Sequence, residues 1–122
     1  MSELGKLADS GAPEVLRGAV RVLRDRGWTK GATRDLETGE VDVLGAIAIA
    51  AGAKIGEVDD RPDLLTTSVP VARRAAALAA WEALEWACDA EPVEWQDNGS
   101  RRIHDVVGAL TKAADRLTIA IR

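Results

Sequence analysis

One short segment, residues 42–53, constrains the fold most strongly, because its apolar side chains would surround a helix on every side. Its apolar residues include Val43, Leu44, Ala46, Ile47, Ala48, Ile49 and Ala50. A helix without a polar face is stable only when other elements bury most of its surface. Asp42 is a favourable N-cap for such a helix. The sequence therefore predicts a short central helix packed inside longer ones.

Two amphipathic segments at opposite ends of the chain can supply that packing. Residues 13–26 place apolar side chains at helical spacing, namely Leu16, Ala19, Val20 and Leu23, and Gly27 follows as a C-cap. After Ser100, a second stripe comprises Ile103, Val106, Val107, Leu110, Ala114, Leu117 and Ile121. Both segments are predicted to be helices that bury one face.

A third long helix is predicted from Thr67 or Ser68 to about Cys88. One side of it carries the alanines Ala72, Ala76, Ala80, Ala83 and Ala87. Such a ridge lets a neighbouring helix approach closely. The opposite side carries Arg74, Leu78, Glu82, Glu85 and Asp89. We expect the alanine side to face another helix and the charged side to face solvent.

The remaining segments are predicted to connect these helices. Residues 28–42 contain glycines, a Thr38-Gly39 turn and alternating valines, which favour two short strands. Residues 54–67 are expected to form a loop and residues 91–99 a turn. Residues 1–11 are expected to be a flexible arm. The predicted fold is mainly α, a single domain over residues 12–122 with about four helices and a short β-ribbon between the first two.

The scarcity of reactive side chains restricts the chemistry. The chain of 122 residues has one histidine, His104, and one cysteine, Cys88. A zinc site takes three or four ligands from His, Cys and carboxylates, and a catalytic triad needs a histidine beside its nucleophile. No such signature surrounds either residue. We therefore expect a protein that is not an enzyme, with no catalytic residues, no cofactor and no metal.

Charge and hydropathy indicate a protein of the cytoplasm. The net charge is −4, with acidic and basic residues interspersed, which argues against general affinity for nucleic acid. The longest apolar run covers residues 43–53, whereas a transmembrane helix needs about 20 residues. A single cysteine fits a reducing compartment. We expect a cytoplasmic location and no association with membranes.

Trp81 is the leading candidate for an interaction surface. Trp28, Trp86 and Trp95 are expected in the core, whereas periodicity places Trp81 near the charged stripe of its helix. The alternative for Trp81 is partial cover by the predicted ribbon or by the loop at residues 54–67. Leu78 lies one turn away, and a polar rim is supplied by Arg74, Glu82 and Glu85. An apolar centre with a charged rim is typical of protein interfaces. We therefore expect a protein-interaction module that binds a protein partner or a second copy of itself.

A second, less favoured function uses the other end of the chain. Arg17, Arg21 and Arg24 share one side of the helix predicted at residues 13–26. Such a face can contact phosphate groups or an acidic partner. This alternative is a small regulator associated with nucleic acid.

Several segments together resemble a family of small actinobacterial and mycobacteriophage domains of unknown function. The matching segments are Arg24-Asp25-Arg26-Gly27-Trp28, Gly31-Ala32, Thr38-Gly39, Val43-Leu44-Gly45-Ala46-Ile47 and Trp95-Gln96-Asp97. The common form of the last motif carries Asn at the position of Gln96. The resemblance spans about residues 13–118 and implies a mostly helical fold with a small ribbon. It also favours a phage-encoded or prophage-linked protein, and it transfers no activity, cofactor or catalytic residue. The expected interaction module would then be a phage or prophage accessory protein that binds a host protein.

Overall fold

The computed structural model describes residues 10–61 and 63–120. The predicted arm at residues 1–11 lies outside this part except for its last two residues. Within it the chain forms α2 (Ala12–Arg26), α3 (Val43–Ala50), η1 (Ile55–Glu57), α4 (Leu64–Thr67), η2 (Val71–Arg73), α5 (Arg74–Cys88), α6 (Pro92–Asp97) and α7 (Ile103–Ala120). The prediction of a mainly helical fold is confirmed. The prediction of about four helices is wrong, because the described residues form six α-helices and two short 3-10 helices.

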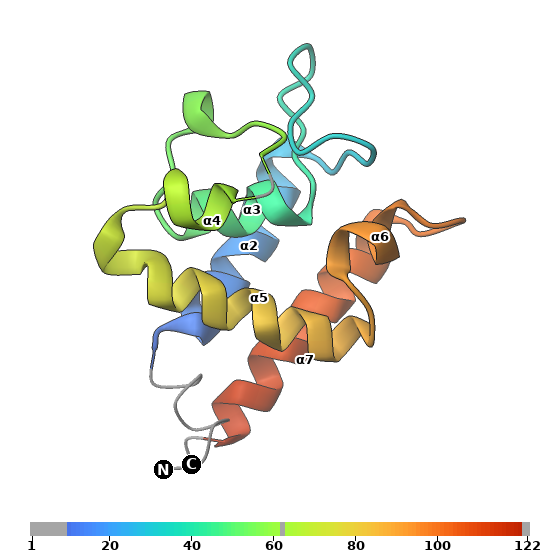
Figure 1. Ribbon diagram of the computed structural model, residues 1–122. Coiled ribbons are helices and arrows are strands. Elements are labelled where there is room, and N and C mark those ends of the chain that lie inside the picture. Colours follow the sequence, from blue (N-terminus) through green and yellow to red (C-terminus); the bar gives the residue numbers. More distant parts are fainter. Residues whose placement is uncertain (1–9, 62, 121–122) are drawn as a thin grey trace.

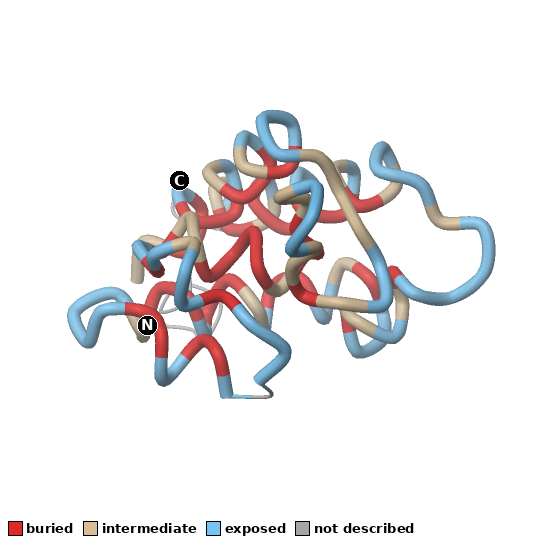
Figure 2. The backbone as a smooth tube through the Cα atoms, turned by 90° about the horizontal axis from the view of Figure 1, so that it is seen from above, coloured by how far each residue is buried: buried red, intermediate tan, exposed pale blue. Residues whose placement is uncertain are grey.

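The three long helices α2, α5 and α7 pack against one another, and α3 packs against α2 (Figure 1). Buried residues gather through the centre of the fold, and exposed residues lie both on the outer sides of the helices and in the connecting segments (Figure 2). No helix of the described ranges is long and apolar enough to cross a membrane.

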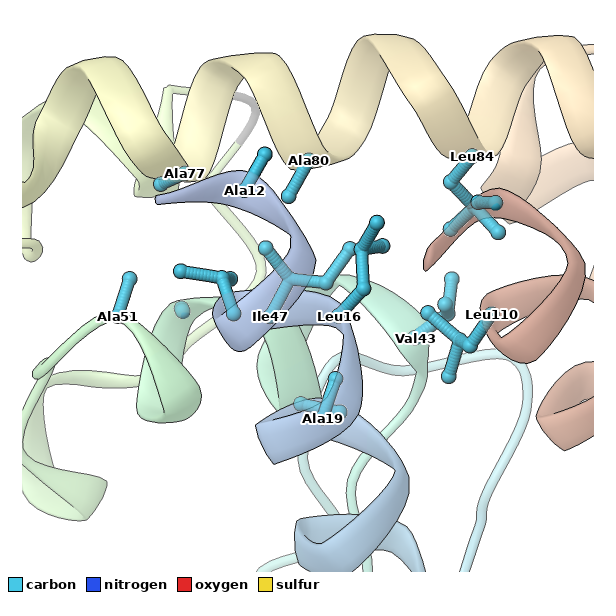
Figure 3. Packing of buried hydrophobic residues seen from close by; sticks show 14 of the residues in the cluster. Ala12, Leu16, Ala19, Val43, Ile47, Ala51, Ala77, Ala80, Leu84 and Leu110 are labelled. Atoms are coloured by element: carbon cyan, nitrogen blue, oxygen red, sulfur yellow. The ribbon is translucent and has the colours of Figure 1, made fainter. Parts of the chain in front are cut away.

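The short helix α3 forms part of the centre, as its sequence predicts. Ile47 is fully buried and lies beside Leu16 of α2, with Ala80 of α5 above them (Figure 3). Asp42 is the N-cap, and its side chain accepts a hydrogen bond from the backbone nitrogen of Gly45. A Cβ at Gly45 would lie 2.8 Å from the backbone oxygen of Thr33. Only glycine therefore allows the preceding loop to lie this close to α3.

The alanine side of α5 faces the core over most of its length. Ala76, Ala80 and Ala83 are buried. The helix begins at Arg74, however, and not at Thr67 or Ser68. Pro70 is extended there, with ψ at 141°, and a 3-10 turn follows it before α5 begins. Ala72 lies in that turn and is exposed, so the ridge is shorter than predicted.

The predicted β-ribbon is absent from the described residues. Val41 makes two isolated bridges, a parallel one with Trp28 and an antiparallel one with Arg34. Both neighbours pair with the same single residue, so no ladder extends in either direction. The next alternating residue, Val43, already belongs to α3 because Asp42 caps that helix. Residues 28–42 thus form a loop held by bridges.

Three short helical elements, α6, η1 and α4, occupy segments that were predicted to be irregular. The chain forms α6 because Pro92 fits the first turn of a helix and Glu91 accepts a hydrogen bond from Glu94 N at 2.7 Å. Within the predicted loop at residues 54–67, η1 and α4 form, and Leu64 and Leu65 of α4 are buried. Proline can begin a helix as well as end one, and Pro92 begins α6.

The tryptophans differ from the sequence prediction at one position. Trp86 is 44% exposed, and the cations of Arg116 and Lys112 lie 3.7 and 5.1 Å from its ring centroid. The prediction that Trp86 lies in the core is therefore wrong. Its ring lies at the surface, where it packs against long basic side chains of α7. Trp28, Trp81 and Trp95 are half-buried and pack against the core.

Candidate functional site

A pocket of about 680 Å³ opens beside α5. Its large apolar side chains come from four helices and are those of Leu44, Leu65, Leu78, Trp81 and Val93. These residues belong to α3, α4, α5 and α6, which are labelled in Figure 1. Leu78 is 46% exposed. The size lies in the range of pockets that bind ligands or side chains of a partner.

The polar lining of the pocket is strongly acidic. It contains five carboxylates, those of Asp42, Asp60, Asp63, Glu91 and Asp97, and a single basic residue, Arg61. The Nε of Arg61 lies 2.8 Å from both carboxylate oxygens of Asp59. The positive charge of Arg61 is thus already paired with a residue outside the lining.

A buried hydrogen-bond network supports the inner side of the pocket. Gln96 of α6 is fully buried. Its Oε1 accepts hydrogen bonds from Trp28 Nε1 at 3.1 Å and from Val43 N at 3.0 Å. Its Nε2 donates to Asp42 Oδ2 at 2.9 Å. Since Asp42 Oδ1 accepts from Gly45 N at 2.9 Å, one glutamine joins α6, the start of α3 and the 28–42 loop.

A second contact holds the same loop against the end of α6. Asp97 Oδ1 accepts a hydrogen bond from Gly31 N at 3.0 Å, and Lys30 Nζ donates to Gly99 O at 3.1 Å. The segments around Trp28 and Gln96, which are far apart in the chain, therefore lie together in space. We call the contacts Trp28–Gln96, Gln96–Asp42 and Gly31–Asp97 the polar clasp.

Burial raises the pKa of Asp42 from its ordinary 3.8 to about 6. Loss of hydration is the main cause, and the charge of Asp97 adds to it. The hydrogen bonds from Gly45 and Gln96 act in the opposite direction. Because both oxygens of Asp42 accept hydrogen bonds from these internal donors, we assign this carboxylate a structural role as helix cap and clasp member.

The raised pKa of Asp42 makes stability depend on pH. The native state binds this proton more tightly than the unfolded chain, so the contribution is fully present below about pH 4 and is lost as pH rises through about 6. A shift of about two units corresponds to about 3 kcal/mol. In urea unfolding, the stability of the wild type relative to Asp42→Ser is expected to fall by this amount between about pH 4 and pH 7. A relative stability that stays constant or rises would contradict the expectation.

The structure separates the residues of the predicted Trp81 interface into two groups. Leu78 and Trp81 line the pocket. Glu82 and Glu85 are exposed on the same helix but are not among the lining residues. Arg74 is half-buried, and its Nε donates to Val69 O at 3.0 Å. The apolar centre of the predicted surface thus belongs to the pocket, whereas its predicted polar rim does not line it.

The arginine face of α2 consists of Arg17, Arg21 and Arg24, and one of these residues, Arg17, is hydrogen-bonded to the neighbouring helix α7. Arg17 Nη2 donates to Asp115 Oδ1 at 3.3 Å and to Thr118 Oγ1 at 3.0 Å, both on α7. Arg21 and Arg24 are exposed. Two of the three arginines therefore remain on an open surface.

The two reactive side chains lie apart from the pocket lining. Burial raises the pKa of the Cys88 thiol to about 11, so the thiol is protonated near neutral pH. The His104 side chain is 75% exposed, and its Nε2 lies 3.6 Å from Asp105 Oδ1. Over the ranges that the structure describes, no group of three or more His, Cys, Asp and Glu residues is placed to hold a metal ion.

Sequence reasoning missed the acidic part of the pocket and the role of Gln96. The carboxylates come from three separate segments, 59–63, 91–97 and the α3 cap, so no local motif contains them. One signal was available: acidic residues are concentrated in the connecting segments 57–63 and 89–97, which carry few basic ones. That pattern indicates a negative patch only once the fold brings the two segments together.

Comparison with curated proteins and with solved structures gives no match. A family model matches residues 8–116, which is most of the chain. The chain therefore belongs to DUF6197, a family of unknown function.

Proposed function

We propose that this protein is a non-enzymatic interaction module that binds a protein partner through the pocket beside Trp81. In this proposal it acts in the cytoplasm as a phage or prophage accessory protein, and the partner is a host protein. The observation that carries the proposal is the apolar wall of the pocket, formed by Trp81, Leu78 and their neighbours from three other helices.

The arrangement supports binding for a physical reason. Trp81 is half-buried and packs against the core, so its ring is held in place and loses little further freedom when a partner covers it. Leu78 is exposed and would bury apolar surface on binding. Tryptophan in a partly enclosed pocket is the residue type most often found at binding hot spots.

The test compares variants of α5 for binding to a partner captured from native-cell lysate, identified by mass spectrometry and then purified. Trp81→Ala is expected to weaken binding by about 2 kcal/mol or more, the hot-spot threshold. Leu78→Ala should weaken binding by about 1 kcal/mol, and its exposure makes it safe for folding. Isothermal titration calorimetry measures the dissociation constants, and circular dichroism confirms the fold of each variant.

Trp86→Ala is the matched control, because Trp86 lies on the same helix, is exposed and does not line the pocket. Its effect on binding should stay within about 0.5 kcal/mol. Equal binding by wild type, Trp81→Ala and Leu78→Ala would refute the proposal. Loss of binding in Trp86→Ala alone would move the interface to the α5–α7 side.

A further inference from the structure

Three exposed carboxylates around the pocket are held by hydrogen bonds to backbone nitrogens, and none of the five lining carboxylates forms an ion pair with a described residue. Asp60 Oδ1 accepts from Thr33 N at 2.6 Å, and Asp97 and Glu91 each accept from a backbone nitrogen in the same way. Each of these three carboxylates uses one oxygen, and its second oxygen accepts no hydrogen bond from a described residue. Asp63 accepts no side-chain cap hydrogen bond.

The lining of the pocket is more acidic than the chain as a whole, because it has five carboxylates and one basic residue, whereas the chain has 20 acidic and 16 basic residues. Throughout the described ranges, the ion pairs join Arg17 to Asp115, Arg61 to Asp59 and His104 to Asp105. None of the pocket carboxylates takes part in them. Four of the five carboxylates belong to exposed residues. Several negative charges thus surround an apolar wall. Asp60, Asp97 and Glu91 are held by backbone nitrogens, so these three side chains lose little freedom when they bind a cation.

We infer that the partner segment which fills this pocket is basic and apolar: an arginine or lysine side chain next to a leucine-like one. This inference rests on the proposed function. The apolar side chain would cover Leu65 and Leu78, while the cation would meet Asp60 and Asp63. Complementary charge of this kind selects the partner and accelerates association. The pocket volume of about 680 Å³ fits several side chains of a peptide segment.

Three synthetic octapeptides serve as probes: one alternates Leu and Arg, one alternates Leu and Glu, and one alternates Ser and Arg. Binding is followed by ¹H–¹⁵N NMR at the Trp81 indole and the Leu65 and Leu78 amides. The Leu/Arg peptide is expected to bind at least about tenfold more tightly than either other peptide. Raising the salt concentration from about 0.05 to about 0.5 M should weaken it severalfold, because the charges lie at the surface.

The acidic residues can be neutralised without removing their hydrogen bonds to the backbone. In Asp60→Asn the amide oxygen still accepts from Thr33 N, and Asp63→Asn loses no cap hydrogen bond. The double variant is expected to bind the Leu/Arg peptide at least about tenfold more weakly. Glu14→Gln with Asp25→Asn is the matched control, because it makes the same charge change at exposed positions of α2 that do not line the pocket. The control should change affinity by less than about twofold.

The inference is overturned if the Leu/Glu or the Ser/Arg peptide binds as tightly as the Leu/Arg peptide. It is also overturned if spermidine competes equally well, which would indicate a small polycation. Self-association that disappears in the Asp60→Asn and Asp63→Asn double variant would make a second copy the occupant instead.

Binding of the captured partner to two sets of variants distinguishes failure of this inference from failure of the proposed function. Insensitivity of that partner to Trp81→Ala and Leu78→Ala would refute the proposed function. Sensitivity to those two variants without sensitivity to Asp60→Asn and Asp63→Asn would refute only the basic character of the segment.

Discussion

Replacing Ile47 with aspartate is expected to unfold the protein. Ile47 is fully buried in α3, beside Leu16 and below Ala80 (Figure 3). The change removes a core side chain and places a charge where no cation lies, which costs about 4 kcal/mol or more. Folded proteins hold only about 5–15 kcal/mol of stability. Circular dichroism should show a loss of helix at room temperature or a strongly lowered Tm.

Ile119→Asp is the control for this result, since Ile119 lies on α7 and is 67% exposed. The same chemical change there should shift stability by no more than about 0.5 kcal/mol. An Ile47→Asp protein that melts at the wild-type temperature would show that α3 is not part of the core.

Replacing Gln96 with leucine is the second change expected to have a large effect. The two side chains have similar volumes, but leucine leaves Trp28 Nε1 and Val43 N without their acceptor and Asp42 Oδ2 without its donor. Each unpaired buried group costs about 1–3 kcal/mol. We expect a loss of about 3 kcal/mol or more in the free energy of unfolding measured with urea.

Two further substitutions at Gln96 identify which hydrogen bonds matter. Gln96→Glu retains the acceptor for Trp28 and Val43 but places an oxygen against Asp42 Oδ2, so it should be destabilised at neutral pH and recover on acidification. Gln96→Asn retains both functions on a shorter side chain and should be milder than Gln96→Leu. A Gln96→Leu protein as stable as wild type would show that the clasp contributes nothing to the fold.

Helices with a clear pattern of apolar residues, including the short helix α3, could be predicted from the sequence, whereas the shortest helices, α4 and α6, could not. Residues 13–26 were predicted to be helical, and α2 covers Ala12–Arg26. The apolar stripe before Cys88 likewise indicated α5. By contrast, α4 has four residues and α6 has six, which is too short for a periodic pattern. They are stabilised by local capping and by burial of side chains such as Leu65 and Gln96, and this burial depends on the tertiary fold.

Of the residues that line the candidate site, only Leu78 and Trp81 could be predicted from the sequence. Helical spacing alone places Leu78 and Trp81 on one side of α5. The acidic half depends on contacts between segments that are far apart in the chain. The polar clasp joins α6 to the 28–42 loop through Gln96 and Asp97, and Asp60 accepts a hydrogen bond from Thr33 N of the same loop. Periodicity carries no information about such a contact. Periodicity also led to the wrong prediction for Trp86. The contact of its ring with Arg116 of α7 depends on the tertiary fold, which periodicity does not describe.

The packing of α2 against α7 has a consequence for synthesis of the protein. These are the first and last helices of the described chain, and Arg17 is hydrogen-bonded to Thr118. At about 5–20 residues per second, a ribosome needs on the order of 10 s between finishing α2 and finishing α7. During that time the apolar stripe of α2 has no α7 to cover it. The core can therefore be completed only after α7 has been synthesised, whatever structure the nascent chain has formed before.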